Sequence, residues 1–330
     1  KETKPSNSVK KKKKAKVKVE RTHSFEPAWW GNILKDTNHD EYPPVHTLIL
    51  GTHPSIASLS KNEMFGHPLS AFGYLAGDSL GFRRSAAVSP TTGKPYVYFH
   101  DRLRYDNEHI LEYSQQLELL VSKGFAMWDI VAECEREGSL DQDIEEEVAN
   151  PIREFCEGTL NNIDQMASVQ RIIIANGSTG AKFFVKHFTQ WFVDGKLCAA
   201  SDDMSQRAFK SVMNKARKVH GEISMSDDND VIEVVVFPGV SPAAAKFTYL
   251  EKRAAWETSC YGPGLKDYET WQFNRLTEQS SHKSPVKQMM QTPKKESATA
   301  RANTPRTPSS SPKGPVVRIL SSDIAKLTPE

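Results

Sequence analysis

Four short segments of the sequence combine titratable or hydrogen-bonding side chains with Gly or Pro. His53 lies in the first segment with Ser70 a little downstream, whereas Asp129 and Asn176 stand at the ends of two later apolar runs. A neutral imidazole can accept a proton, and a serine hydroxyl can hold a water molecule by a hydrogen bond. If the chain brings these segments together, they can form a site that binds a ligand and moves protons.

The apolar runs that precede these segments have the composition of buried strands. They are rich in β-branched residues and end at Gly, Pro or Asn, and they cover residues 45–50, 125–130, 171–175 and 231–237. Helical patterns cover residues 109–122, 143–161 and 180–191. This alternation predicts a parallel sheet with helices on both faces. Ligands bind at the carboxyl edge of such sheets, so we expect the segments after the strands to converge there.

Two of these segments carry backbone amides that could receive an anion. Asn176, Gly177 and Ser178 open a helix, and residues 238–245 form a second turn before a helix. Both turns can also be plain connections between a strand and a helix, and Asp129 can be a helix cap. These interpretations stay open when each segment is considered alone.

Considered together, the segments resemble the uracil-DNA glycosylase superfamily, in particular its hypoxanthine-DNA glycosylase branch. That branch shows Leu-Gly-Ser-x-Pro-Gly-x-x-Ser-Leu and His-Pro-Arg-Asn-x-Phe-Trp. The corresponding segments here are Leu-Gly-Thr-His-Pro-Ser-Ile-Ala-Ser-Leu at 50–59 and His-Pro-Leu-Ser-Ala-Phe-Gly at 67–73. Further matches are Gly-Phe-Ala-Met-Trp-Asp at 124–129, Cys-Glu-Arg-Glu-Gly-Ser-Leu-Asp at 134–141, Ala-Asn-Gly at 175–177, Pro-Gly-Val-Ser-Pro-Ala at 238–243, and Lys and Trp in 252–256.

The resemblance implies an α/β protein, a three-layer α/β/α sandwich around a short, mainly parallel four-stranded sheet. It also implies a monofunctional DNA glycosylase of base-excision repair that flips a deaminated or mismatched base, such as hypoxanthine or uracil, and hydrolyses its N-glycosidic bond. The roles that it implies are catalysis for His53, Ser70 and Asp129; base binding for Thr52, Phe72 and Asn176; and DNA binding for Gly177, Ser178, Gly239, Val240, Ser241 and Pro242. Val240 would be the apolar wedge.

Two positions depart from the family pattern. Ser70 replaces the Asn of His-Pro-Arg-Asn, and His53 stands where mismatch uracil glycosylases carry Asn. Either His53 acts as the base, or Ser70 positions water, or the domain binds DNA without catalysis. This last interpretation is the alternative function.

The net charge of +2 conceals a division along the chain. Residues 1–23 carry +8 and residues 277–330 carry +5, so the body, residues 24–276, carries −11. We expect both ends to be disordered. The N-terminal segment is expected to serve nuclear targeting, with an organellar address as the alternative, or to contact phosphate. The C-terminal segment is expected to offer Ser/Thr-Pro sites to a proline-directed kinase. Because the sequence begins with Lys1, we expect a fragment or a processed chain.

Two insertions separate the motifs. Residues 82–107 combine arginines with tyrosines, so they form either a DNA contact or a surface hairpin. Residues 192–230 are predicted to contain a helix that is either a DNA-facing stripe or a solvated helix face. Its basic residues are Arg207, Lys210, Lys215, Arg217 and Lys218.

Cysteine spacing and hydropathy exclude several classes of protein. Cys134, Cys156, Cys198 and Cys260 form no Cys-x-x-Cys pair, which argues against structural zinc, an iron–sulfur cluster and a disulfide framework. No apolar run approaches the length of a membrane span. We therefore expect no metal, no cofactor and no membrane partner.

Overall fold

The computed structural model describes residues 21–34, 41–85, 88–89, 91–104, 109–160, 168–221, 231–242 and 244–281. The basic segment up to residue 20 and the Ser/Thr-Pro sites beyond residue 281 lie outside the described residues. The predicted targeting and kinase roles of these segments therefore stay predictions.

A parallel sheet forms the centre of the body, and four of its five strands coincide with the four apolar runs. The strand order is β3-β2-β6-β8-β7, with every neighbouring pair parallel. The strands are β2 (Thr47–Gly51), β3 (Phe125–Asp129), β6 (Arg171–Ile174), β7 (Leu197–Ala199) and β8 (Ile232–Val236). The sheet has five strands instead of the four predicted, because the insertion at 192–230 supplies β7 at the edge.

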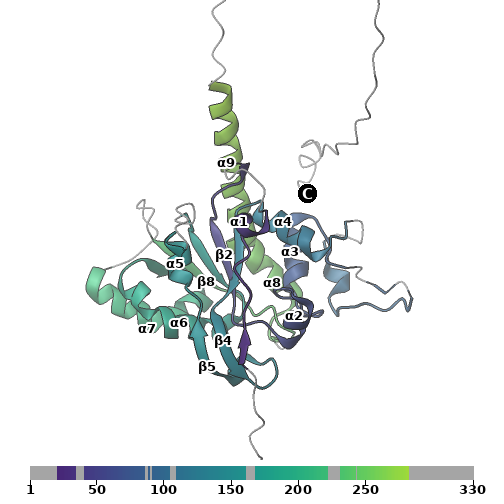
Figure 1. The fold of residues 1–330 in the computed structure, drawn as a ribbon, viewed down its shortest axis with the longest axis horizontal. Coiled ribbons are helices and arrows are strands. Elements are labelled where there is room, and N and C mark those ends of the chain that lie inside the picture. The colour runs from purple at the N-terminus through teal and green to yellow at the C-terminus, as the bar shows by residue number, and fades with distance from the viewer. Residues whose placement is uncertain are drawn as a thin grey trace, which may run out of the picture. The chain divides into compact units, whose positions relative to one another are not determined.

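Helices cover both faces of this sheet (Figure 1). On one side lie α5 (Ile152–Cys156), α6 (Gly177–Val193) and α7 (Asp203–His220). On the other lie α2 (Ile56–Lys61), α3 (Phe72–Leu80), α4 (Tyr113–Val121) and α8 (Tyr249–Trp256). The chain also forms α1 (Trp30–Ile33), a π-helix at Glu257–Tyr261 and α9 (Gly262–Ser281). The α/β/α prediction is confirmed.

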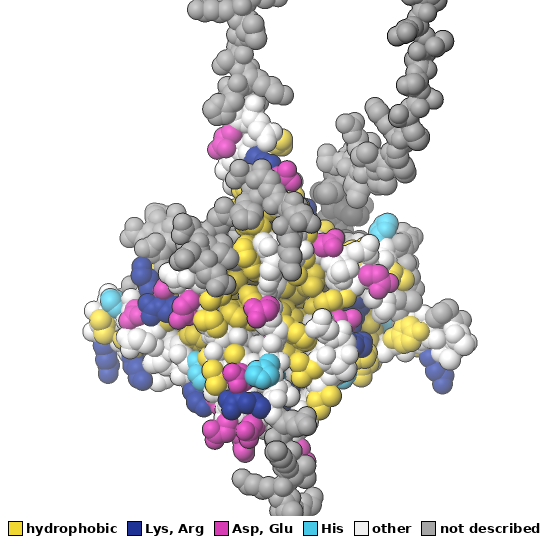
Figure 2. Space-filling model, viewed as in Figure 1, with side chains coloured by type: hydrophobic (Ala, Val, Ile, Leu, Met, Phe, Trp, Pro, Cys, Tyr) yellow, Lys and Arg dark blue, Asp and Glu magenta, His cyan; other side chains and the backbone are white. Residues whose placement is uncertain are grey.

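A second, antiparallel sheet replaces part of the helix predicted at 143–161. Its order is β1 (Arg21–His23), β4 (Val131–Arg136) and β5 (Ile144–Ala149). The helix prediction was wrong there, because Ile144 is buried while Glu145 and Glu146 face solvent against β4, and helix α5 starts only after Pro151. Acidic side chains gather at the free end of this sheet (Figure 2). Arg21–His23, which precede the predicted boundary at residue 24, pair with β4.

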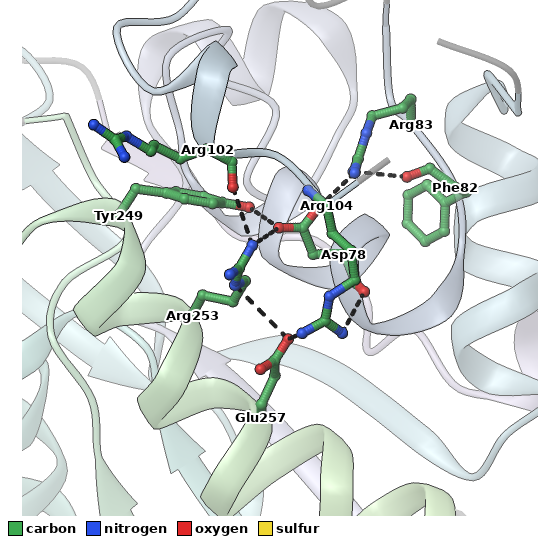
Figure 3. Close-up of polar contacts among 8 residues, drawn as sticks. All are labelled: Asp78, Phe82, Arg83, Arg102, Arg104, Tyr249, Arg253 and Glu257. Atoms are coloured by element: carbon green, nitrogen blue, oxygen red, sulfur yellow. Dashed lines mark hydrogen bonds and ion pairs between the residues drawn. The ribbon is translucent and has the colours of Figure 1, made fainter. Parts of the chain in front are cut away.

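The insertion at 82–107 is fastened to the body by a buried carboxylate, Asp78 of α3 (Figure 3). Asp78 accepts hydrogen bonds from the Arg83 guanidinium at 2.5 Å, the Tyr249 hydroxyl at 2.9 Å and the Arg104 backbone N–H at 3.0 Å. Arg253 completes the group at 3.2 Å. Asp78 and Arg83 are both fully buried, so the start of the insertion belongs to the core. Farther along, residues 91–96 are exposed next to an antiparallel bridge between Val88 and Pro95, which fits the surface hairpin.

Candidate functional site

A cavity of about 550 Å³ opens at the carboxyl edge of the parallel sheet. It brings together most of the residues that the sequence marks as functional. The predicted residues that line it are His53, Ser70, Asp129, Asn176, Gly239, Val240, Ser241 and Pro242, whereas Thr52, Phe72, Gly177 and Ser178 lie behind or beside it. Its volume is within the range of small-molecule sites.

Backbone hydrogen bonds hold the cavity loops together. The Ala71 N–H donates to the Val240 carbonyl oxygen at 2.9 Å, and the Val240 N–H donates to the Ala175 carbonyl oxygen at 3.1 Å. The segments after β2, β6 and β8 are therefore one connected rim, as the parallel topology predicts.

Asp129 is the most strongly perturbed group in the cavity. It ends β3 directly beside Gly51 of β2, and a side chain at position 51 would collide with the Asp129 carboxylate. Glycine at position 51 therefore allows the carboxylate to lie over the β2 backbone. Burial, and secondarily the negative charge of Asp141, raises the Asp129 pKa to about 7. The group can thus accept or donate a proton at neutral pH.

His53 lies 5% exposed in the cavity wall, but both ring nitrogens face backbone carbonyl oxygens. Nδ1 is 3.2 Å from the Pro54 oxygen, and Nε2 is 3.3 Å from the Thr22 oxygen in β1. Burial lowers the His53 pKa, so the ring is neutral at pH 7. A neutral ring carries one N–H and can donate to one of these two oxygens, so His53 contacts the backbone of β1 and of its own loop.

Ser70 is buried in the cavity wall, and its Oγ accepts a hydrogen bond from the Phe72 backbone N–H at 3.4 Å. The hydroxyl proton remains available to a ligand or a water molecule.

Phe65, which the sequence analysis did not single out, takes the place predicted for Phe72. Phe65 lines the cavity and stacks on Phe72, with ring centroids 4.2 Å apart. Phe72 lies beneath it, against Trp256. Phe65 has φ of 53°, a left-handed conformation that is uncommon for an aromatic residue and frequent at binding sites. The aromatic face in the cavity lining is therefore that of Phe65.

Asn176 is held in place by two acceptors. Its Nδ2 donates to Thr52 Oγ1 at 3.0 Å and to Asp141 Oδ2 at 3.2 Å. Arg136 Nη2 donates to the Pro54 carbonyl oxygen at 2.5 Å, and its Nη1 lies 3.7 Å from Asp141. Thr52 and Asp141 thus position Asn176. Arg136 and Asp141 were not predicted as site residues, although both belong to the motif at 134–141.

Val240 and the end of the basic helix, which the sequence left open as a DNA-facing stripe or a solvated helix face, do not project from the cavity mouth. Val240 is only 2% exposed, so it cannot project into a DNA groove as a wedge. Helix α7 begins at the carboxyl edge of the sheet. Its last residue, His220, contacts the carbonyl oxygen of Val193, which precedes β7 and therefore lies toward the amino edge of the sheet. Its basic residues Lys215, Arg217 and Lys218 therefore lie toward the edge opposite the cavity, where Figure 2 shows Lys and Arg side chains over α7.

The described part of the chain contains no group of three or more His, Cys, Asp or Glu side chains arranged to hold a metal ion. Its four cysteines are buried free thiols. Within the same residues, no helix combines the length and the apolar character needed to cross a bilayer.

Fold and cavity together define an α/β protein with a cavity at the carboxyl edge of a parallel sheet. No family model matches the chain. A curated protein, hypoxanthine DNA glycosylase of Methanosarcina barkeri (strain Fusaro / DSM 804), is 23% identical over 175 residues, covering 52% of this chain and 90% of that protein. A relationship to the uracil-DNA glycosylase superfamily, predicted from the motifs, is thereby confirmed.

Among solved structures, the solution NMR structure of a protein from Methanosarcina acetivorans, proposed to be a uracil DNA glycosylase, is similar. It has a TM-score of 0.40 and 18% identity, and the match covers 73% of this chain and 96% of that one. The fold given above rests on the strand order and helix placement of the chain itself.

Proposed function

We propose that the protein is a monofunctional DNA glycosylase that hydrolyses the N-glycosidic bond of a deaminated base, hypoxanthine or uracil. The observation that carries the proposal is the buried Asp129 carboxylate, with a pKa of about 7, in a cavity of about 550 Å³. The named activity of the Methanosarcina barkeri relative supports the same reaction class.

In this mechanism Asp129 acts on the sugar side of the flipped nucleotide. As a carboxylate it accepts a proton from the attacking water and offsets the positive charge that develops on the sugar. The Ser70 hydroxyl, in the same wall, orients the water. Phe65 supplies the face on which the base stacks.

The start of α6 acts on the base side. The leaving base acquires negative charge in the transition state, and the positive end of a helix dipole stabilises such a charge. Helix α6 begins at Gly177, and Asn176 and Thr179 beside it line the cavity. We therefore assign leaving-group stabilisation to this turn.

Asn176 supplies a reason for selecting deaminated bases. Its two hydrogen bonds to Thr52 and Asp141 use both hydrogens of Nδ2, so its Oδ1 is the atom left for a base edge. Hypoxanthine and uracil present a ring N–H where adenine and cytosine present a lone pair. An acceptor at Oδ1 therefore favours the deaminated base over its parent.

The cavity gives no basis for a strand-cleaving step. Lysine is absent from the described residues that line it, and a lyase reaction through a Schiff base requires an amine. The expected product is therefore an intact strand with an abasic site.

The test is incubation of the purified chain with duplex and single-stranded oligonucleotides that contain hypoxanthine, uracil or a G·T mismatch, followed by alkali. Alkali-labile sites at hypoxanthine or uracil are expected. They should disappear with Asp129→Asn and persist with the control Asp143→Asn, because Asp143 is exposed outside the cavity. Measurable DNA binding without cleavage of any substrate would overturn the proposal.

The second candidate function is DNA binding without catalysis. It is favoured by the two departures from the family pattern, because Ser70 and His53 stand where that pattern has Asn and both His53 ring nitrogens face carbonyl oxygens. The same oligonucleotide assay decides between the two functions.

Nuclear localisation is a further proposal, based on the lysine-rich segment at residues 10–18. Imaging of the tagged full chain tests it, and loss of nuclear signal on deletion of that segment is the expected result. Mass spectrometry that finds no phosphate at the Ser/Thr-Pro sites of residues 284–312 would refute the proposed kinase partner.

A further inference from the structure

The insertion at 82–107 presents two tyrosine rings to solvent. It projects from the body beside α3 (Figure 1). Tyr96 is 49% exposed and Tyr98 is 73% exposed, whereas Val97 and Phe99, which alternate with them, are buried. The apolar residues of this segment therefore anchor it to the body, and the two tyrosines are left on its outer side.

Tyr98 is presented from an ordered aromatic group. Its ring meets that of Phe99 edge to face, with centroids 5.0 Å apart. The Phe99 ring stacks on Tyr249 of α8 at 4.3 Å, and Tyr74 of α3 lies 5.3 Å from it. Because buried neighbours fix Phe99, the segment holds Tyr98 in a defined position. Binding to a surface that is already in place costs less conformational entropy.

The insertion is basic, unlike the body that carries it. Residues 82–107 contain five basic and two acidic side chains, a net charge of +3, whereas the body as a whole carries −11. Two of its arginines form ion pairs with α3 and with the π-helix. Lys94 and Arg102 are exposed on either side of the tyrosines in the sequence, and the ion pair of Arg102 with Asp101 is itself exposed and therefore weak. Positive charge thus accompanies the two rings.

The insertion starts at the wall of the cavity. Arg84 Nη1 donates a hydrogen bond to the His67 carbonyl oxygen at 3.3 Å, and His67 lines the cavity. The Arg84 guanidinium also lies over the Tyr74 ring, 5.8 Å from its centroid. A strand of nucleic acid that reaches the cavity on the His67 side therefore meets the base of the insertion.

We infer that the outer side of the insertion is a second nucleic-acid surface, which binds single-stranded DNA beside the cavity. Proteins that bind single strands without sequence preference combine aromatic rings, which stack on unpaired bases, with cations that contact phosphate. In a duplex the base faces are covered by neighbouring pairs, so Tyr96 and Tyr98 have nothing to stack on. The inference goes beyond the proposed function, because this surface holds a strand whether or not the cavity cleaves a base.

The test measures binding of the full chain to a labelled single-stranded oligonucleotide without a damaged base, by fluorescence anisotropy. Tyr98→Ala should weaken binding by about tenfold, the order expected for the loss of one base–aromatic stack. Tyr98→Phe should bind like the wild type, because the ring and not the hydroxyl stacks. The matched control Phe273→Ala removes a ring that is 69% exposed on α9 and should leave the affinity unchanged.

A duplex of the same sequence separates stacking from general attraction to phosphate. On the duplex Tyr98→Ala should leave the affinity unchanged. Equal losses on single strand and duplex, single-strand binding that is insensitive to Tyr98→Ala, or no single-strand binding by the wild type would overturn the inference. None of these readouts depends on cleavage, so a failed cleavage assay removes the proposed function and leaves the single-strand surface to be decided by binding.

Discussion

Replacing Asp129 by Asn should strongly lower the activity and at the same time stabilise the protein. Asn keeps the size of the side chain but removes the ionisable oxygen, so it cannot accept a proton from water. The Asp129 carboxyl group is buried, and desolvation is the main reason that its pKa is raised from 3.8 to about 7. The charge that serves the reaction is therefore costly for the fold.

The catalytic effect follows from the role of a general base. Loss of such a group lowers a rate by about 10²- to 10⁴-fold. In the wild type the carboxylate fraction rises from about one tenth at pH 6 to about nine tenths at pH 8, so the cleavage rate should rise about tenfold over this interval with a midpoint near pH 7. The residual rate of Asp129→Asn should not follow this curve.

The stability effect has the opposite sign. A carboxyl group whose pKa is higher in the folded state makes unfolding easier as pH rises through the interval between the unfolded and folded values. Between pH 4 and 7 the ionisation of Asp129 should lower the free energy of unfolding by an amount on the order of 4 kcal/mol. Asp129→Asn should therefore be more stable than the wild type at pH 8, and the difference should vanish near pH 4.

Urea denaturation at pH 4 and 8 and single-turnover cleavage from pH 5.5 to 8.5 measure these two effects. The control Asp143→Asn should match the wild type in both assays, because that residue is exposed. A wild-type rate independent of pH, or an Asp129→Asn variant that is less stable than the wild type at pH 8, would refute the reasoning.

Three further predictions concern the surroundings of the site. Asp141→Asn removes the charge that contributes to raising the Asp129 pKa, so the midpoint of the pH–rate profile should move to lower pH; an unchanged or higher midpoint would contradict this. Asp78→Ala leaves the Arg83 guanidinium buried without its carboxylate, so it should lower the free energy of unfolding by about 3–5 kcal/mol in urea titrations. The control Asp101→Ala removes an exposed ion pair and should change the free energy of unfolding little. Deleting residues 1–20, which precede β1, should weaken DNA binding and make its salt dependence shallower in fluorescence anisotropy; equal slopes would show that the lysines do not contact phosphate.

The central strands could be predicted because their signal is local. β-branched runs such as Arg171–Ile174 are buried on both faces of a parallel sheet, which leaves a continuous apolar segment in the sequence. β7 has no such signal, since Leu197–Ala199 is three residues long and acquires strand geometry only by pairing with β8. The helix predicted at 143–161 failed for a related reason, because pairing of β5 with β4 outweighed the helical pattern.

Part of the site could also be predicted from the local signal of the apolar runs. Asp129 and Asn176 were found because each closes an apolar run, and the sheet topology then brings both to one edge. Phe65 was missed because its position on the cavity wall depends on a left-handed turn that its residue type does not predict. The burial of Val240 depends on hydrogen bonds to Ala71 and Ala175, which are distant in sequence, so its wedge role could not be judged beforehand.

The position of β1 bears on how a body with a charge of −11 can approach DNA. The Thr22 carbonyl oxygen lies 3.3 Å from His53 Nε2, so the point where the basic segment joins the fold is at the cavity wall. The lysines at 10–14 precede Arg21 by at most eleven residues, a length of chain that spans at most about 40 Å. The basic segment is therefore joined to the fold at the wall of a cavity that carries acidic groups such as Asp129 and Asp141. Because long-range attraction to phosphate depends on charge close to the contact, a segment attached at this edge offsets the acidic body more effectively than the same charge on the far end of α7.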